Sequence, residues 1–285
     1  MTRQIASTLS VLLAIFALGG STAQAQDAEA FTWTNATELS FVSTSGNQSQ
    51  TSFGLKGVLE GSSDVNAFKL ELGGVRASST FLIRTAEGTE ADYVVNTSKR
   101  TEESAASYYA RARYDRNLSP STFLYGSGGW ERNTFAGFNH RYSVAAGIGR
   151  AWVDNEESLF KTDIGATYTL QKDVEVNPEK DEGYFGLRAN IEGRKALSSS
   201  AELSTILILD ESLTYTEDFR ADWTASIAVD LIEGLAFKTS YQLLFDNDPA
   251  LVSAPLFTGG VENGAVLVPS KEFDSFLTLS LVITI

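Results

Sequence analysis

Residues 220–245 read RADWTASIAVDLIEGLAFKTSYQLLF, and this stretch decides the fold class. Apolar side chains occupy every second position from Ala221 to Leu231, and the alternation resumes after Glu233-Gly234. A period of two over this length predicts two paired β-strands with unlike faces. One face is apolar, and the other carries charged residues. The fold therefore depends on which apolar medium covers the first face, a second sheet or lipid.

The same alternation recurs in about twelve segments of roughly 11–14 residues, the length that a tilted strand needs to cross a bilayer. Strands in soluble sandwiches are shorter, about 5–6 residues. We therefore predict an all-β fold, a single antiparallel transmembrane β-barrel. The segments lie near residues 31–44, 51–61, 66–77, 105–115, 121–131, 140–153, 158–171, 184–195, 201–212, 219–231, 235–246 and 273–285.

The connections between the segments alternate in length. Short connections such as 154–157 and 233–234 alternate with long ones, and 78–104 and 247–272 are the longest. Short turns on one side and long loops on the other are typical of bacterial outer-membrane barrels. We expect 78–104 to be one loop, with an extra hairpin around ADYVVN (91–96) as the alternative. The first hairpin breaks this pattern, because Gly46-Asn47 predicts a tight turn on the long-loop side.

The first residues have the order of a secretory signal. Arg3 precedes an apolar run at 8–18, and the small-residue sequence AQA follows at 23–25. We expect residues 1–25 to be a signal peptide and 26–285 to form the barrel domain, located in the outer membrane of a Gram-negative cell envelope. The absence of Cys excludes a lipoprotein and a disulfide scaffold. The net charge of −14 argues against a nucleic-acid partner.

The polar face of the strands carries charges of both signs. A charge that faces lipid at the midplane costs about 2–4 kcal/mol, so these side chains are expected to face the lumen. Opposite charges on neighbouring strands would then fill the lumen as cross-strand pairs. In a soluble sandwich the same side chains would face water. The candidate lumen-facing charges are Lys56, Arg111, Arg113, Lys161, Asp163, Arg188, Glu192, Asp222 and Lys238.

Aromatic residues are frequent near the strand ends. In a barrel they predict the two girdles at the membrane interfaces, whereas in a sandwich they would be core residues. They are Trp33, Tyr108, Tyr109, Trp130, Tyr142, Trp152, Tyr168, Tyr184, Trp223 and Tyr241.

Several short patterns resemble a family of salt-induced outer-membrane proteins, the YdiY-like β-barrels with a domain of unknown function. They are TSGN at 44–47, YYARARYDRNLSPSTFLYG at 108–126, WERNTFAGFNHRYSVAAGIG at 130–149 and DNDP at 246–249. The resemblance implies an outer-membrane barrel and a link to salt or envelope stress. It brings no ligand, reaction or site residue. The terminal Ile285 departs from the aromatic residue that commonly ends outer-membrane strands.

The residues for catalysis do not form a specific pattern. The single histidine, His140, is followed two positions later by Tyr142, whereas outer-membrane phospholipases have Ser there. A hydrolase would then depend on paired carboxylates near the long loops. The candidates are Asp173, Glu175, Asp181, Glu182, Glu217, Asp218, Asp246 and Asp248. No ligand spacing for a metal and no cofactor motif is present, so we expect neither, and no catalytic residue.

The first hypothesis is a structural or solute-permeating (porin-like) barrel that is not an enzyme. Its expected partners are outer-membrane lipid, lipopolysaccharide, the barrel-assembly machinery and small solutes. Two alternatives remain open at this stage. One is a barrel-borne hydrolase with an acidic rim site, and the other is a soluble periplasmic β-barrel that binds an apolar ligand.

Overall fold

The computed structural model describes residues 31–44, 48–89, 92–134, 136–177 and 180–285. The expected signal peptide and the turn at Gly46-Asn47 lie outside these residues. All regular elements in the described part are strands. No helix among the described residues is long and apolar enough to cross a membrane.

Fourteen strands follow one another along the described chain. They are β1 (Thr32–Thr44), β2 (Gln48–Ser62), β3 (Asn66–Thr89), β4 (Asp92–Ser119), β5 (Thr122–Asn133), β6 (Phe138–Asp154), β7 (Ser158–Asp173), β8 (Gly183–Ser198), β9 (Ala201–Ser212), β10 (Phe219–Ile232), β11 (Leu235–Asp246), β12 (Leu251–Thr258), β13 (Val261–Pro269) and β14 (Phe273–Thr284).

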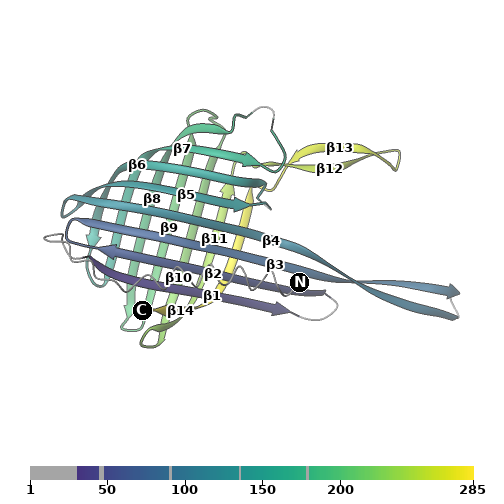
Figure 1. Ribbon diagram of the computed structural model, residues 1–285, viewed down its shortest axis with the longest axis horizontal. Coiled ribbons are helices and arrows are strands. Elements are labelled where there is room, and N and C mark those ends of the chain that lie inside the picture. Colours follow the sequence, from purple (N-terminus) through teal and green to yellow (C-terminus); the bar gives the residue numbers. More distant parts are fainter. Residues whose placement is uncertain (1–30, 45–47, 90–91, 135, 178–179) are drawn as a thin grey trace, which may run out of the picture. The chain divides into compact units, whose positions relative to one another are not determined.

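Twelve of these strands form one closed antiparallel barrel in the described chain, in the order β1-β14-β11-β10-β9-β8-β7-β6-β5-β4-β3-β2 (Figure 1). Residues 220–245 form the β10–β11 hairpin, in which Trp223 pairs with Leu243 and Arg220 with Asp246. Gly234 turns the chain with a φ of 74°, a conformation that glycine adopts without strain. The predicted fold class and strand number are therefore confirmed.

The barrel has a turn side and a loop side. The turn side carries the short connections 63–65, 120–121, 155–157, 199–200 and 233–234, and the loop side carries the connections between the other ends of the strands. Closure depends on β1 and β14, whose ladder runs only from Ala36–Thr284 to Ser40–Ser280. The neighbouring β11–β14 ladder is longer and runs from Leu235–Ile283 to Phe245–Phe273. The β1–β14 seam is thus the shortest ladder of the barrel.

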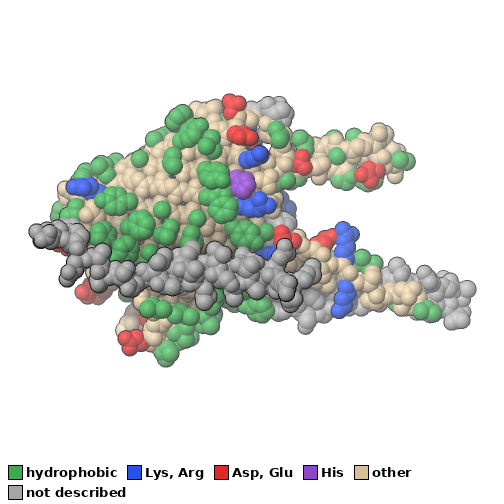
Figure 2. All heavy atoms as spheres, in the orientation of Figure 1, with side chains coloured by type: hydrophobic (Ala, Val, Ile, Leu, Met, Phe, Trp, Pro, Cys, Tyr) green, Lys and Arg blue, Asp and Glu red, His purple; other side chains and the backbone are tan. Residues whose placement is uncertain are grey.

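Large apolar side chains face outward and remain exposed. On β6 and β7 the exposed fractions are 58% for Val144, 48% for Ile148 and 56% for Ile164. Alternate positions of the same strands are covered, as Ala145 (6%) and Thr167 (6%) show. In Figure 2, hydrophobic side chains cover much of the barrel wall in view. This distribution is the reverse of that in a water-soluble protein, where the apolar face is the buried one.

The prediction that residues 78–104 form one loop is wrong. β3 and β4 continue through this region and pair from Asn66–Arg116 to Thr89–Asp92. The ladder between β2 and β3 extends along β3 only as far as Phe81, and the ladder between β4 and β5 starts on β4 at Ser107. The far part of the two strands therefore pairs only with itself, as a ribbon that extends beyond the barrel on the loop side (Figure 1). The alternative of a hairpin around 91–96 is confirmed in part, because Thr85–Asn96 to Thr89–Asp92 are paired, but this hairpin continues β3 and β4 and adds no strand to the barrel.

The second long connection, 247–272, also contains strands that the sequence analysis did not predict. β12 and β13 form a separate two-stranded sheet with a register from Leu251–Pro269 to Thr258–Val261. Gly259 and Gly260 form its turn with φ values of 60° and 83°. The apolar residues of this stretch lack the strict alternation of the barrel strands, which explains why the alternation did not reveal them.

Candidate functional site: the charged lumen

An ion pair that crosses the inside of the barrel identifies the lumen wall. Arg113 on β4 donates from Nη2 to Oδ2 of Asp163 on β7 at 2.9 Å, although β5 and β6 lie between these strands. Arg113 also donates from Nε to Asp115 at 2.7 Å. Asn190 on β8 donates to the other Asp163 oxygen at 2.6 Å. Both partners were candidates in the sequence, and the structure brings them together.

Two aromatic residues of β5 lie beneath this bridge. The Arg113 guanidinium lies 4.3 Å from the centre of the Tyr125 ring and 5.7 Å from that of Phe123. Glycines on β6 and β7 make room for the rings, because a Cβ at Gly149 would clash with Phe123 and a Cβ at Gly165 would clash with Tyr125. Gly149 and Gly165 thus permit a close approach of these two rings to the inner wall.

A second group of charges lies towards the turn side. Lys238 on β11 donates to Glu38 on β1 at 2.7 Å across the intervening strand β14. Lys56 lies 3.9 Å from Glu38 and 3.8 Å from Glu71. Lys69 lies 3.2 Å from Glu71 and 3.0 Å from Glu60. These carboxylates therefore each face at least one ammonium group.

The remaining candidates are distributed around the wall. Arg111 donates from Nε to Glu131 at 3.1 Å, and Arg188 donates to Asp210 at 2.7 Å. Asp222 accepts a hydrogen bond from Gln242 at 2.8 Å.

Lys161 and Glu192 are register partners on β7 and β8. Most of the candidate charges therefore have a partner of opposite sign close by, often on a neighbouring strand.

The interior charges keep contact with solvent. The exposed fraction of the side chain is 31% for Lys56, 38% for Arg111 and 27% for Arg113. Asp163, in contrast, is covered by its partners, with 6% exposed. The interior is therefore lined by paired charges that water still reaches.

The loop-side mouth of the lumen contains two further arginines. Arg141 on β6 donates from Nε to Gln171 at 2.7 Å, and its guanidinium lies 4.0 Å from the centre of the Phe138 ring. Arg220 on β10 lies 3.3 Å from Asp218 and 5.4 Å above the Tyr184 ring.

Tyr184 and Tyr109 correct the prediction of two aromatic girdles. Tyr184 is 6% exposed and shares the inward parity of Arg188 on β8. Tyr109 lies under the guanidinium of Arg111 at 4.8 Å. Parity decides the outcome, because both tyrosines alternate with outward residues. Other aromatics of the set are on the exposed face, among them Trp33, Tyr142, Trp152, Trp223 and Tyr241.

One cation joins three loops on the loop side. Nζ of Lys180 lies 2.6 Å from Oδ2 of Asp248 and 3.8 Å from Oδ2 of Asp218. Partial burial alone would lower the pKa of Lys180, but the hydrogen bond that it donates to Asp248 and the charge of Asp218 outweigh this effect. The pKa of Lys180 is consequently raised above its ordinary value of 10.5. We call this contact the Lys180 latch.

Three of the rim carboxylates are engaged by other side chains. Asp218 and Asp248 come together around Lys180, and Asp173 accepts a hydrogen bond from Gln171 at 2.7 Å. Among the described residues, no group of three or more His, Asp or Glu side chains is arranged to hold a metal ion.

His140 lies among aromatic rings near the loop side. Its Nδ1 accepts a hydrogen bond from Nε1 of Trp130 at 3.2 Å, and its ring stacks on Tyr142 with centres 6.2 Å apart. Figure 2 shows this histidine on the outer surface, next to hydrophobic side chains. Its contacts with Trp130 and Tyr142 describe an aromatic packing role.

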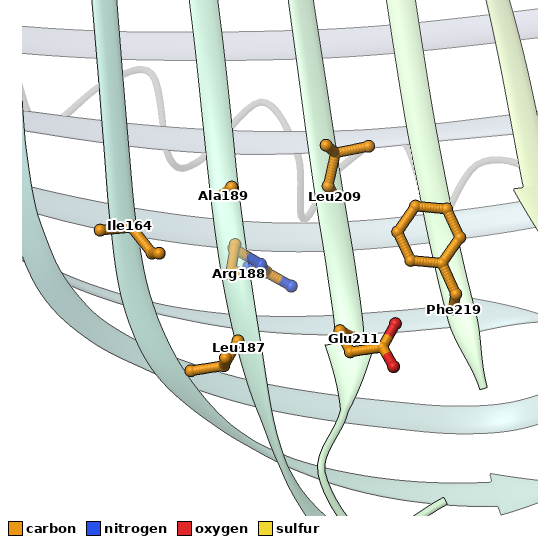
Figure 3. A pocket seen from close by; sticks show the side chains of 7 residues that line it. All are labelled: Ile164, Leu187, Arg188, Ala189, Leu209, Glu211 and Phe219. Carbon is orange, nitrogen blue, oxygen red and sulfur yellow. The ribbon is translucent and has the colours of Figure 1, made fainter. Parts of the chain in front are cut away.

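A shallow hollow of about 110 Å³ lies on the outside of β7–β10. Figure 3 shows Ile164 and Leu187 on two neighbouring strands, with Leu209 and Glu211 on the next. Glu211 has Leu187 and Phe219 as register partners, so it lies on the outward face near the loop-side end of β9. The hollow therefore belongs to the apolar outer surface and is separate from the lumen.

Several residues of the lumen network were missing from the sequence-based set. The alternation along each strand that identified the candidate charges also marks these residues as lumen-facing. It does not show which residues of opposite charge meet across the barrel. The missed residues are Glu38, Asp115, Glu131, Arg141, Tyr184 and Asp210.

The fold and the lumen define the class of the protein, a closed antiparallel barrel with an apolar exterior and a charged interior. The model of the family described as "Protein of unknown function, DUF481" matches residues 37–253, and the chain belongs to this family. The family resemblance seen in the sequence is thereby confirmed. No curated protein matches the chain.

Solved structures with a similar fold include several outer-membrane proteins. The NanC porin is 8% identical, with a TM-score of 0.44 and coverage of 88% of this chain and 99% of that one. The translocator domain of the autotransporter NalP from Neisseria meningitidis is 13% identical, with a TM-score of 0.41 and coverage of 99% and 96%. The COG4313 outer membrane channel from Pseudomonas putida F1 is 11% identical, with a TM-score of 0.41 and coverage of 93% and 100%. The likeness concerns barrel architecture alone.

Proposed function

We propose that the protein is an outer-membrane β-barrel whose charged lumen passes small polar solutes. The observation that carries this proposal is the inverted distribution of side chains. Apolar residues such as Val144 and Ile164 are exposed outside, while Arg113 and Asp163 pair across the inside.

The outer surface supports a location in lipid. A monomeric soluble protein rarely exposes a contiguous apolar patch of more than a few hundred Å². Here the exposed apolar residues recur on most barrel strands, including Phe185 (63%), Ile227 (47%) and Leu277 (68%). In a bilayer the same surface is favourable, and closure of the barrel satisfies the backbone groups within hydrocarbon. Outer-membrane lipid and lipopolysaccharide are the partners that this surface fits, and insertion would require the barrel-assembly machinery.

The lumen supports passage of polar solutes. Its charges are balanced in pairs but remain in contact with solvent, as the exposed fractions of Lys56 and Arg111 indicate. Such a lining would exchange hydrogen bonds with hydrated solutes and would offer little to an apolar ligand. This argues against the soluble barrel that binds an apolar ligand. The hydrolase alternative lacks support because the rim carboxylates Asp218 and Asp248 are both engaged with Lys180.

The experiment is conductance of the refolded chain in planar lipid bilayers, preceded by gel electrophoresis with and without boiling. We expect a heat-modifiable mobility and discrete current steps. A protein that stays soluble without detergent and ignores boiling would overturn the membrane location. A heat-modifiable barrel without current steps would overturn permeation and leave a closed structural scaffold.

Ion selectivity gives a finer test of the lumen. Replacing Arg111 and Arg113 with glutamine removes two interior cations and should shift the reversal potential in a salt gradient towards cation selectivity. The matched control is Arg100→Gln on the ribbon, which is 69% exposed and paired with Glu102 beyond the barrel. An open pore whose selectivity is unchanged by the double substitution would contradict the proposed lining.

A further inference from the structure

The loop-side mouth contains hydrogen-bond donors that the ion-pair network does not use. Arg141 is the clearest case. Its nearest carboxylate oxygen is that of Glu131 at 4.0 Å from Nη1, and Glu131 already accepts two hydrogen bonds from Arg111. Its Nε is engaged by a neutral acceptor, Gln171. The outer nitrogens of this guanidinium therefore have no carboxylate within hydrogen-bonding distance among the described residues.

A second arginine faces the same space. The charge of Arg220 acts on Arg141, although β7, β8 and β9 lie between their strands. Two guanidinium groups that face each other across the lumen repel each other, and an anion bound between them would relieve this repulsion. The side chains are 19% and 14% exposed, so the positive charges are partly shielded from solvent.

A buried hydroxyl group provides the independent observation. Tyr184 is 6% exposed, and its hydroxyl has no hydrogen-bond partner among the described residues. The guanidinium of Arg220 lies 5.4 Å from the centre of the Tyr184 ring, and Arg220 and Arg141 are the two cations whose charge acts on this tyrosine. A buried polar group without a partner is rare in native proteins and indicates an occupant that supplies the missing hydrogen bond.

The surrounding acids limit what the occupant is. Asp218 lies 3.3 Å from Arg220, and Asp246 accepts a hydrogen bond from the backbone of Asp248 at 3.1 Å. A highly charged anion such as a phosphate would be repelled by these two carboxylates. A single carboxylate would fit the two guanidinium groups and the Tyr184 hydroxyl, and hydroxyl groups on the same solute would suit the acids.

We propose that Arg141, Arg220 and Tyr184 form a binding site at the loop-side mouth for a small solute with one carboxylate and several hydroxyl groups. This site rests on the proposed function, because it lies on the proposed solute path. Binding of a solute to it can nevertheless be measured without recording ion flow. Gluconate is a suitable probe. Sorbitol is its matched control, because the two differ only in the carboxylate at one end.

The experiment is isothermal titration calorimetry of the folded barrel in detergent, with bilayer recordings in parallel. We expect binding of gluconate and none of sorbitol at the same concentration. Arg141→Gln and Tyr184→Phe should each weaken gluconate binding by about tenfold, consistent with the loss of one hydrogen bond to a charged group. Arg194→Gln, which removes an arginine paired with Glu202 near the turn side, should leave binding unchanged.

The outcomes separate this site from permeation. Gluconate binding without current steps would support the site and overturn the solute path. Current steps without gluconate binding would overturn the site and leave the path intact. Equal binding of gluconate by the parent, Arg141→Gln and Tyr184→Phe proteins would also overturn it. Heat-modifiable mobility verifies that each variant is folded, and Tyr184→Phe keeps the test decisive if Arg141→Gln does not fold.

Discussion

Arg113 and Asp163 form an ion pair of 2.9 Å from strands that have two others between them. A pair between adjacent strands would stabilise only one ladder. This pair holds β4 to β7 across the curved wall and covers Phe123 and Tyr125 beneath it. It therefore fixes the local curvature of the barrel as well as the charge of the lumen.

Removing one partner of this pair should cost stability. Arg113→Gln leaves the covered Asp163 without its cation, and we expect a loss of about 1.5–3 kcal/mol in the free energy of unfolding. Asp163→Asn should cost less, because Arg113 keeps Asp115 at 2.7 Å. Urea unfolding in lipid vesicles, followed by tryptophan fluorescence, measures both. In the double variant the two losses should be less than additive, and strict additivity would contradict a direct coupling.

The two faces of the wall should respond oppositely to the same substitution. Ile164 is 56% exposed on the outside, whereas Ile206 is the register partner of Glu192 and Thr224 on the lumen side. Ile164→Arg should destabilise the inserted barrel by about 2–4 kcal/mol, the cost of arginine facing lipid near the midplane. Ile206→Arg should cost clearly less, because its charge meets water. Equal losses of folding yield in vesicles would refute the assignment of the faces.

The Lys180 latch should persist at alkaline pH. Because the pKa of Lys180 is raised, its contribution to loop stability is fully present below the ordinary value of 10.5 and is lost only as the pH rises through the raised value. Limited proteolysis of the 174–182 connection should therefore be unchanged between about pH 7 and 10. Lys180→Met should increase cleavage over the whole range, while Lys180→Arg should retain protection. Protection that fades well below pH 10 would contradict the latch.

The short seam between β1 and β14 should limit the stability of the barrel. Leu39 and Leu281 are register partners in this ladder, and the chain contains no Cys that would compete for an introduced pair. Leu39→Cys with Leu281→Cys should form a disulfide and raise the unfolding midpoint in the oxidised state only. Thermal unfolding with and without reductant measures the difference. If the oxidised and reduced proteins had the same unfolding midpoint, with the disulfide verified by mass spectrometry, the seam would not limit the stability of the barrel.

The sequence predicted the barrel strands well because alternation is a local property. In residues 220–245 the position of each apolar residue in the alternation indicates which face of the strand it occupies. The turn at Glu233-Gly234 lies between two stretches that each alternate along their whole length. The pairing of Arg113 with Asp163 could not be predicted in this way, since it depends on how strongly the sheet curves between β4 and β7. The inward position of Tyr184 was missed because its residue type suggested the membrane interface, although its parity indicated the lumen.

The ribbon of β3 and β4 was missed for another physical reason. In the proposed membrane location neither face of the ribbon beyond the barrel would be in lipid, so an alternating apolar face is not needed there, and the adjacent Val94 and Val95 are both exposed. The hairpin of β12 and β13 is similar, with exposed Phe257 and Val261 on either side of its turn. Such segments are held by backbone pairing and a turn, which leave a weaker trace in the order of residues.

The far part of the β3–β4 ribbon also divides one pair of strands into two thermodynamic units. Within the barrel, each of these strands is hydrogen-bonded on both sides, whereas beyond Phe81 and Ser107 each has one partner only. Local opening of the tip therefore needs no disruption of the closed ring. Amide hydrogens at residues 94–100 should exchange with deuterium through this local fraying, while those at 108–116 should exchange only with global unfolding. A single pair of strands would thus give both the fastest and the slowest protons of the molecule.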